Sequence, residues 1–469
     1  MIVSAVNPPP AAPAHPGRIA CLATHGGHAG GSAIAMERLA AGLRLHGVTV
    51  EVVTRDAIGP ARLPAERRLR RAIKRSRVGD GTTMFTSDWP TWDIAAHPIV
   101  AAADVVNVHW VAGFLGAESI RRLVAAGKRV IWTLHDMRPF TGGCHYAGAC
   151  AGFTEGCQAC PQLEAVSREA ARRAAAVAVR RLRGVPLTFV TPSRWLAGAV
   201  VRSRLYDPKA HAVEVIPNGL DLARHAPAGD RRGIRRRLGL PEDGFGILLG
   251  STCLGERRKG IREAVGALTM LPTACRAARP PFVVTFGAVA PEIAALPGWH
   301  LGPQGEAGVI EALQACDVHL TMTRDDNLPN TVMESMACGV PVVATAVGGL
   351  PEMVTHGVDG WLVPRDDSAA AAAVLARLAA EPDTVAAAAH AARHRASADW
   401  DQRLVADRYL RLAAALPSPP ATRAPAPVAV LPPSPAAARL LRTSLFLRRV
   451  RRLATRGRSL AVLPLERHP

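Results

Sequence analysis

Apolar, β-branched segments of strand length alternate with longer segments of helical periodicity along most of this chain. In the first example, a strand at 18–22 runs through a glycine-rich loop at 26–31 into a helix at 32–46, and a second strand follows at 48–54. Strands joined by such a crossover lie parallel in one sheet. The chain is therefore predicted to be an α/β protein with parallel sheets.

The alternation occurs in two successive series, which predicts two Rossmann-like domains facing each other across a cleft. At roughly 150 residues per domain, a chain of 469 residues has room for two large domains. The turn Pro217-Asn218-Gly219 lies near the start of the second series and is a candidate hinge. Further strands are expected at 105–110, 129–134 and 187–191 in the first series, and at 213–216, 246–251, 282–286, 318–321 and 341–344 in the second.

The segments outside the two series complete the predicted domain organisation. Eight of the nineteen residues from 417 to 435 are proline, which is typical of an extended linker. The predicted divisions are an N-terminal extension (1–16), an N-terminal domain (17–205) with a cysteine-rich loop (141–161), a C-terminal domain (206–398), a closing helix (399–416), the proline-rich linker (417–435) and a basic amphipathic tail (436–469).

Most of the formal net charge of +19 comes from two short stretches of the chain. Residues 62–77 hold eight basic residues and one acid, and residues 417–469 hold ten arginines and one acid. Each stretch is either a solvated face or a contact for an anionic surface such as a membrane or an acidic glycan. Nucleic acid is not expected as a partner, because neither stretch interleaves aromatic residues with its charges.

No apolar run reaches the roughly 18 residues that span a bilayer, and residues 1–16 lack the pattern of a signal peptide. The expected location is therefore the cytoplasm, at the inner face of the cell membrane if the basic stretches bind it.

Loops at the carboxyl ends of the predicted strands are the candidate binding sites, because ligands of open α/β sheets collect there. Glycines at 26–31 let backbone N–H groups approach a phosphate at a helix N-terminus. The spacing does not match G-x-G-x-x-G, so a tight structural turn explains this loop as well as a ligand site does.

A second candidate loop runs from Arg324 through Asn330 to Pro341, and Val347-Gly348-Gly349-Leu350-Pro351-Glu352 follows it. This block resembles the signature of two acids eight residues apart in retaining, family 4 (group 1) glycosyltransferases with the GT-B fold, of the colanic-acid and exopolysaccharide type. Asp326 and Glu334 match the two acids, and helical geometry would place them on nearly one face. The similarity extends from about residue 17 to 415.

The resemblance implies roles for particular residues of this chain. Asp326 would hold hydroxyls of the donor sugar, and Glu334 would hold the ribose of its nucleotide. Arg258 and Lys259 would neutralise the donor diphosphate, although Arg257 competes for the arginine position. Histidine 135, at the end of the 129–134 strand, would lie against the donor sugar. Further donor contacts are expected at Gly30, Gly31, Asn327, Leu328, Gly348 and Gly349, and acceptor-side positions at His109 and Asp136.

The same family implies transfer of a sugar from a nucleotide-sugar donor to a saccharide or lipid-linked acceptor, with retention of configuration. No metal cofactor is expected for catalysis, since the family neutralises the diphosphate with side chains and helix N-termini. Two other readings stay open: a nucleotide-sugar epimerase or glycan phosphorylase, and a nucleotide-sugar-binding protein with little turnover. The second is kept because Asp326 stands where the family usually has Glu.

Four cysteines lie in one glycine-rich loop, at Cys144, Cys150, Cys157 and Cys160. They fit a structural zinc site, but the gaps between the first three are wider than in common zinc pairs. Two disulfides or free thiols are the alternatives. Similar insertions in related polysaccharide glycosyltransferases favour a structural role for the loop.

Overall fold

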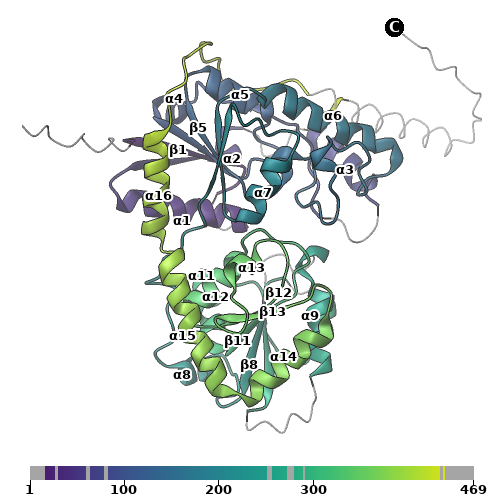
Figure 1. The fold of residues 1–469 in the computed structure, drawn as a ribbon, viewed down its shortest axis with the longest axis vertical. Helices are drawn as coiled ribbons and strands as arrows, with labels where there is room; N and C mark the ends of the chain where they lie inside the picture. Colours follow the sequence, from purple (N-terminus) through teal and green to yellow (C-terminus); the bar gives the residue numbers. More distant parts are fainter. Residues whose placement is uncertain are drawn as a thin grey trace, which may run out of the picture.

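A computed structural model describes residues 16–26, 30–59, 64–78, 83–250, 256–271, 279–288, 291–433 and 437–438. It has two α/β domains, each built on a six-stranded sheet (Figure 1). The predicted α/β class is confirmed, and so are the two Rossmann-like halves. Most of the basic tail lies outside the described residues.

The sheet of the N-terminal domain has the order β2-β1-β4-β5-β6-β7, and every neighbouring pair is parallel. Its strands are β1 (Arg18–Ala23), β2 (Thr49–Thr54), β4 (Val105–Val108), β5 (Arg129–Thr133), β6 (Leu187–Thr191) and β7 (His211–Val215). Its helices are α1 (Gly31–Leu45), α2 (Arg55–Ile58), α3 (Pro64–Arg75), α4 (Pro98–Ala102), α5 (Ala117–Ala125), α6 (Ala165–Leu182) and α7 (Arg194–Arg202).

Strand β7 corrects the predicted boundary between the domains. The sequence placed this segment at the start of the second series, but β7 pairs with β6 from Leu187↔His211 to Thr191↔Val215. The N-terminal sheet therefore extends past residue 205. Periodicity identifies a strand, whereas the choice of sheet depends on pairing with a distant segment.

The sheet of the C-terminal domain has the order β10-β9-β8-β11-β12-β13 and is also parallel. Its strands are β8 (Phe245–Gly250), β9 (Pro281–Phe286), β10 (Trp299–His300), β11 (Val318–Thr321), β12 (Val342–Thr345) and β13 (Gly360–Val363). Its helices are α8 (Arg231–Arg237), α9 (Ile261–Met270), α10 (Pro291–Ala294), α11 (Glu306–Ala315), α12 (Asn330–Ala337), α13 (Leu350–Met353), α14 (Ser368–Ala380) and α15 (Pro382–Asp399).

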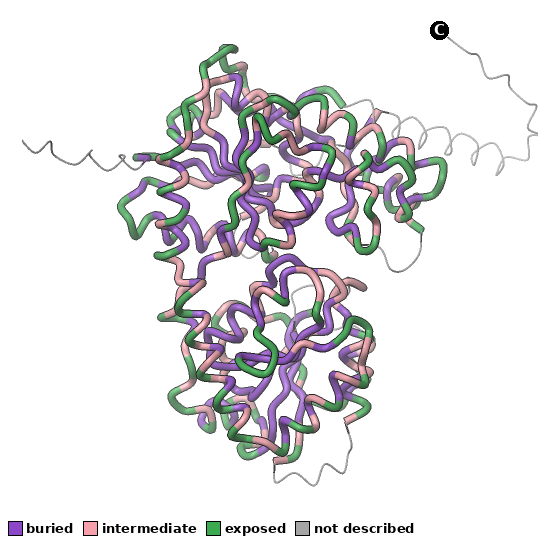
Figure 2. Tube along the Cα trace, in the orientation of Figure 1, coloured by how far each residue is buried: buried purple, intermediate pink, exposed green. Residues whose placement is uncertain are grey.

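The central strands form the interior of both domains, and Figure 2 shows buried strands within more exposed helices and loops. All residues of β4, β6 and β8 are buried. Strands covered by helices on both faces are mostly apolar, as these are, because neither face meets water.

Helix α16 (Gln402–Ala415) returns from the C-terminal domain to the N-terminal one (Figure 1). Asp401 caps it by accepting a hydrogen bond from the backbone N–H of Arg403 at 2.7 Å. Tyr409 of α16 lies 3.0 Å from the hydroxyl of Thr133 in β5, and the helix packs on α1. The chain therefore joins the two domains a second time.

The proline-rich segment corrects another prediction, because part of it packs against the N-terminal domain. Strand β14 (Ala429–Val430) pairs antiparallel with β3 (Trp92–Asp93). The carbonyl of Leu431 accepts a hydrogen bond of 2.9 Å from the indole of Trp89. Periodicity did not reveal this docking, since two residues are too few to show a pattern.

Among the described residues, no helix is long and apolar enough to span a membrane.

Three arginines converge on one buried carboxylate in the C-terminal domain. Asp317, just before β11, accepts bonds of 2.9, 2.8 and 2.7 Å from Arg231, Arg235 and Arg279. It also accepts a 2.7 Å bond from the backbone N–H of Gly246. Burial would raise the pKa of Asp317, but the arginines hold it below its usual value. This cluster ties α8 and the edge of β9 to the centre of the sheet.

We expect Asp317→Asn to lower the free energy of unfolding by roughly 3 kcal/mol, because it leaves the buried guanidinium group of Arg235 without its counter-charge. Thermal denaturation at neutral pH would show a clearly lower Tm. Asp243→Asn is the control, since Asp243 and its partner Arg232 are 78% and 68% exposed and such pairs contribute little. Equal Tm values for the two variants would contradict the assigned role of Asp317.

Candidate active site

A cavity of about 810 Å³ lies between the two domains, at the carboxyl ends of strands from both sheets. Most of the residues that the sequence singled out line it: Gly30, Gly31, His135, Asp136, Arg258, Lys259, Asp326, Asn327, Leu328 and Glu334. His109, Gly348 and Gly349 are not among its lining residues and lie behind those that are. Residues 27–29 of the glycine loop lie outside the described part of the chain.

Two cations hold the carboxylate of Asp326. Arg258 Nη1 and Lys259 Nζ donate to Oδ2 at 2.8 and 2.7 Å. Burial alone would raise the pKa of Asp326, but the two cations outweigh it and hold the pKa well below its usual value. Asp326 is therefore ionised at neutral pH and lies within a compact array of opposite charges.

The turn that carries the two cations depends on a glycine. Gly260 has φ +67°, and a Cβ there would lie 1.7 Å from the carbonyl oxygen of Met322. The turn can therefore approach the end of β11, where Arg324 donates its backbone N–H to the carbonyl of Arg258 at 2.7 Å. Arg257 instead binds Glu263 at 2.6 Å. Arg258, and not Arg257, therefore joins Lys259 in binding Asp326.

The two acids do not share a helical face, which corrects the sequence-based expectation. Only Glu334 lies in α12, while Asp326 lies in the loop before it and accepts a 2.9 Å bond from the backbone N–H of Asn327. Gly348 explains why this loop can fold so tightly. Its φ is +57°, and a Cβ would lie 1.8 Å from the carbonyl oxygen of Asp326. Gly348 supports the site from behind.

Glu334 makes a contact with the opposite domain that the sequence did not predict. Arg38 of α1 donates to its Oε1 at 2.8 Å and to Glu306 at 3.3 Å. Arg38 and Glu334 are both nearly buried, so each charge compensates the other. Arg38 lies within the apolar pattern of α1, and only the tertiary structure brings it to Glu334.

Tyr146 also crosses the cleft, from the cysteine-rich loop to Asp326. Its ring lies 4.4 Å from the guanidinium carbon of Arg258, within cation–π range. Its hydroxyl donates to Oδ1 of Asp326 at 3.4 Å. Tyr146 is buried and stacks on Trp195 at 6.3 Å between ring centroids. The loop therefore forms part of the active-site wall.

Gly148 of the same loop donates its backbone N–H to Asp325 Oδ2 at 3.2 Å. Burial raises the pKa of Asp325 to about 6, and the charge of neighbouring Asp326 adds to the rise. The adjacent acids therefore differ: Asp326 is ionised throughout the physiological range, and Asp325 titrates within it.

Asn327 connects the loop to the N-terminal domain. Its Oδ1 accepts a 2.5 Å bond from the hydroxyl of Ser193, and its Nδ2 donates to the carbonyl of His135 at 3.3 Å. Asn330 likewise donates to the carbonyl of Gly31 at 2.9 Å. These hydrogen bonds join the two domains at the walls of the cavity.

His135 pairs with His109 at the ends of β5 and β4. Nδ1 of His109 and Nε2 of His135 are 3.1 Å apart, and the rings stack. Burial lowers both pKa values, that of His135 to about 4, so the pair is neutral at pH 7. Nε2 of His109 has no partner among the described residues. The neutral ring of His109 is therefore assigned its proton on Nδ1, from which it can donate to Nε2 of His135.

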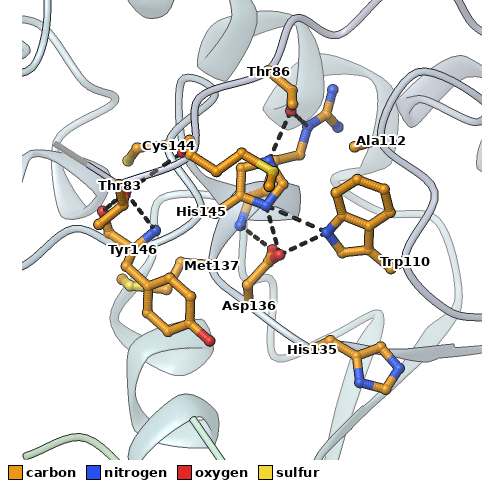
Figure 3. A network of polar contacts seen from close by, with 12 residues as sticks. Thr83, Thr86, Trp110, Ala112, His135, Asp136, Met137, Cys144, His145 and Tyr146 are labelled. Carbon is orange, nitrogen blue, oxygen red and sulfur yellow. Dashed lines mark hydrogen bonds and ion pairs between the residues drawn. The ribbon is translucent and has the colours of Figure 1, made fainter. Parts of the chain in front are cut away.

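Asp136, which follows His135 directly, hydrogen-bonds to other partners than the ring of His135. Figure 3 shows it turned toward Trp110 and His145, with His135 apart from the network. Oδ2 of Asp136 accepts from Trp110 Nε1 at 2.8 Å and lies 2.6 Å from His145 Nδ1. His145 reaches the hydroxyl of Thr86 at 3.0 Å through its other nitrogen. Asp136 therefore anchors the loop that carries Tyr146.

The four loop cysteines are free thiols, three of them buried, so the disulfide alternative is not what the structure shows. Within the described part of the chain, no three His, Cys, Asp or Glu side chains are grouped so that they could hold a metal ion. As placed, the thiols do not form the predicted four-thiolate set, and the zinc site stays a prediction.

Family comparisons match both domains. Residues 29–224 match the model of Glycosyltransferase Family 4, and residues 291–381 match that of Glycosyl transferases group 1. Together the two matches cover more than half of the chain.

Curated relatives include a D-inositol 3-phosphate glycosyltransferase of Saccharomonospora viridis, 32% identical over 41% of this chain and 48% of the relative. Another is a putative colanic acid biosynthesis glycosyl transferase of Escherichia coli, 27% identical over 56% and 63%. The chain thus spans about half to three-fifths of these relatives.

Solved structures share the fold over nearly their whole length. A sucrose-phosphate synthase of Thermosynechococcus elongatus has a TM-score of 0.61 and 19% identity, over 84% of this chain and 98% of that one. Anabaena HepE, solved with UDP and glucose, has a TM-score of 0.55 and 17% identity, over 85% and 99%. At this identity the likeness shows the two-domain GT-B fold.

Asp325 generates a prediction about pH. Its folded-state pKa, about 6, exceeds the ordinary 3.8, so between these values the folded chain binds more protons than the unfolded chain. This carboxyl therefore lowers stability as pH rises from about 4 to 6. Asp325→Asn should keep the bond from Gly148 and raise Tm relative to the parent more at pH 7.5 than at pH 4.

Thermal melts across this pH range, with Asp243→Asn as an exposed control, measure the effect. A Tm difference between Asp325→Asn and the parent that does not change with pH would rule out the assigned titration.

Proposed function

We propose that this chain, which belongs to the family 4 (group 1) glycosyltransferases, transfers a sugar from a nucleotide-sugar donor to a hydroxyl of an acceptor saccharide. One observation carries the proposal: Asp326, held by Arg258 and Lys259, faces the same cavity as Glu334, held by Arg38. A nucleotide sugar offers hydroxyls for both acids and a diphosphate for the two cations.

Arg258 and Lys259 bind the donor diphosphate in this proposal. Bond cleavage builds negative charge on the departing diphosphate, and preorganised donors stabilise it by about 3 kcal/mol each. Both cations are already positioned by Asp326, by the Gly260 turn and, for Arg258, by the ring of Tyr146. Little reorganisation is needed, and the side chains supply the neutralising charge without a metal ion.

The two acids divide the donor between them. Glu334 accepts from the ribose hydroxyls, and Arg38 keeps it ionised and oriented. Asp326 lies beside the diphosphate-binding cations and holds hydroxyls of the transferred sugar. Its carboxylate stabilises the positive charge that develops on the sugar ring in the transition state.

His135 contributes a neutral ring at the N-terminal wall. Its low pKa keeps it uncharged at pH 7, so it can hydrogen-bond the donor sugar without repelling the developing positive charge. The neighbouring His109 sets its tautomer.

The acceptor is a saccharide carried on a lipid, presented at the inner face of the cell membrane, and the product retains the donor's configuration. The name of the colanic acid relative supports a place in polysaccharide biosynthesis. In the retaining mechanism the departing diphosphate takes the proton of the acceptor hydroxyl. An NMR time course that shows inversion at the transferred sugar would exclude this mechanism.

Nucleotide release from a panel of UDP- and GDP-sugars, with and without lipid-linked acceptors, tests the function. Release that depends on acceptor supports transfer, and tight donor binding without release indicates a binding protein instead.

Glu334→Gln should raise the donor KM at least tenfold, because it removes charge-assisted hydrogen bonds worth about 1.5 to 3 kcal/mol. Asp326→Asn should mainly lower kcat, since its interaction strengthens in the transition state. The control is Glu311→Gln, which removes a half-exposed acid of α11 that pairs with Arg237. If both active-site variants keep the parent kcat and KM, the assignment of the two acids is wrong.

A further inference from the structure

Helix α3 lines one part of the cavity with basic side chains that the donor site does not use. Arg70, Arg71 and Lys74 from the helix and Arg77 just after it all face this cavity. We name these four residues the α3 cationic face. The sequence identified the 62–77 stretch only as a solvated face or a contact for an anionic surface, and the structure places half of its basic residues along the cavity.

Basic side chains outnumber acidic ones along the wall of this cavity. Among its described lining residues, eight are Lys or Arg and six are Asp or Glu. Each acid already has a cationic or histidine partner: Arg55 for Glu66, His145 for Asp136, Arg258 for Glu256, Arg38 for Glu306 and Glu334, and Lys259 for Asp326. The four basic residues without a described carboxylate partner are those of the α3 cationic face.

The helix is held in a defined orientation by its opposite face. Leu69 and Ile73 are buried, and Glu66 forms a buried two-bond ion pair with Arg55 at 2.9 and 2.6 Å. Residues one position later in the helix, Arg70 and Lys74, consequently point away from that core and remain exposed. The cationic face is therefore presented by a fixed scaffold.

Arg77 adds a partly buried side chain to this face. Its Nη2 donates to the carbonyl of Thr83, and its Nε is buried without a partner among the described residues. Burial lowers the pKa of Arg77, which reflects how little water reaches it. An anion beside it would satisfy a donor that the described residues leave free.

Apolar side chains line the cavity beside the cationic face. Met84 and Phe85 follow Thr83 and are lining residues, and Met84 is 45% exposed. A ligand of this part of the cavity can thus combine an anionic group with an apolar one.

We infer that the α3 cationic face binds a phosphate group of the acceptor, so that this enzyme's acceptor is a phosphorylated saccharide. The inference rests on the proposed function. Guanidinium groups bind phosphate with paired N–H donors. Several such groups together match the double negative charge of a phosphate better than they match the single charge of a carboxylate. The donor diphosphate has its own cations, Arg258 and Lys259, which leaves the α3 face for the second substrate.

A solvated basic face is the competing explanation, and the helix contains its own control. Arg67, Arg68 and Arg75 are exposed on α3 but are not lining residues of the cavity. A charge that serves solubility or a membrane surface would depend on these residues as much as on Arg70, Arg71 and Lys74.

The test compares two triple variants of the full chain, Arg70→Gln/Arg71→Gln/Lys74→Gln and Arg67→Gln/Arg68→Gln/Arg75→Gln. Calorimetric titration with octyl phosphate should show at least a tenfold weaker Kd for the first variant and less than a twofold change for the second. Equal losses in both variants, or no loss in the first, would overturn the inference. Circular dichroism confirms that both variants fold.

Inorganic phosphate and octyl phosphate separate the two sources of this chemistry. If octyl phosphate binds the parent protein more tightly, the acceptor is lipid-linked, whereas equal affinities indicate a soluble sugar phosphate. Both outcomes support the inference, provided that the first triple variant weakens them. Titration with UDP should give the same Kd in the parent and the first variant. If no nucleotide sugar is turned over, the proposed function fails while the phosphate result still stands.

Discussion

A charge removed from water must be paired, and this requirement organises the cleft of this protein. The two principal acids of the site, Asp326 and Glu334, are each held by basic side chains from another segment, and these pairs join elements far apart in the chain. Arg38 of α1 reaches Glu334 of α12, and the turn before α9 supplies the cations for Asp326. Because the contacts are short and buried, they determine how the loops at the strand ends lie and how the two domains face each other.

The same electrostatic arrangement gives neighbouring groups different properties. Asp325 and Asp326 are adjacent, yet burial raises the pKa of one to about 6 while two cations lower that of the other. The histidine pair is neutral because burial disfavours its charge. The cleft therefore contains an ionised acid, neutral rings and two cations at one pH, which is the set of charges that sugar transfer from a diphosphate requires.

The cysteine-rich loop links fold and chemistry. Asp136 holds the loop through His145, and the loop places Tyr146 against Arg258 and Asp326. A loop that looked like an independent structural insertion is thus one wall of the active site. The structure likewise divides the basic residues of α3 into two groups, since some of them line the cavity and others are exposed away from it.

Local patterns in the sequence determined most of the strands, the first and closing helices, the two-domain class and the residues of the Asp326–Glu334 loop, because periodicity and motif spacing depend on neighbours along the chain. They did not determine that β7 joins the first sheet, that residues 429–430 dock on β3, or that Asp136 serves His145. Arg38 and Tyr146 carried no motif, so their place in the site was invisible. Each of these outcomes depends on a pairing between residues distant in sequence, and only the folded chain decides which distant groups come close enough to bond.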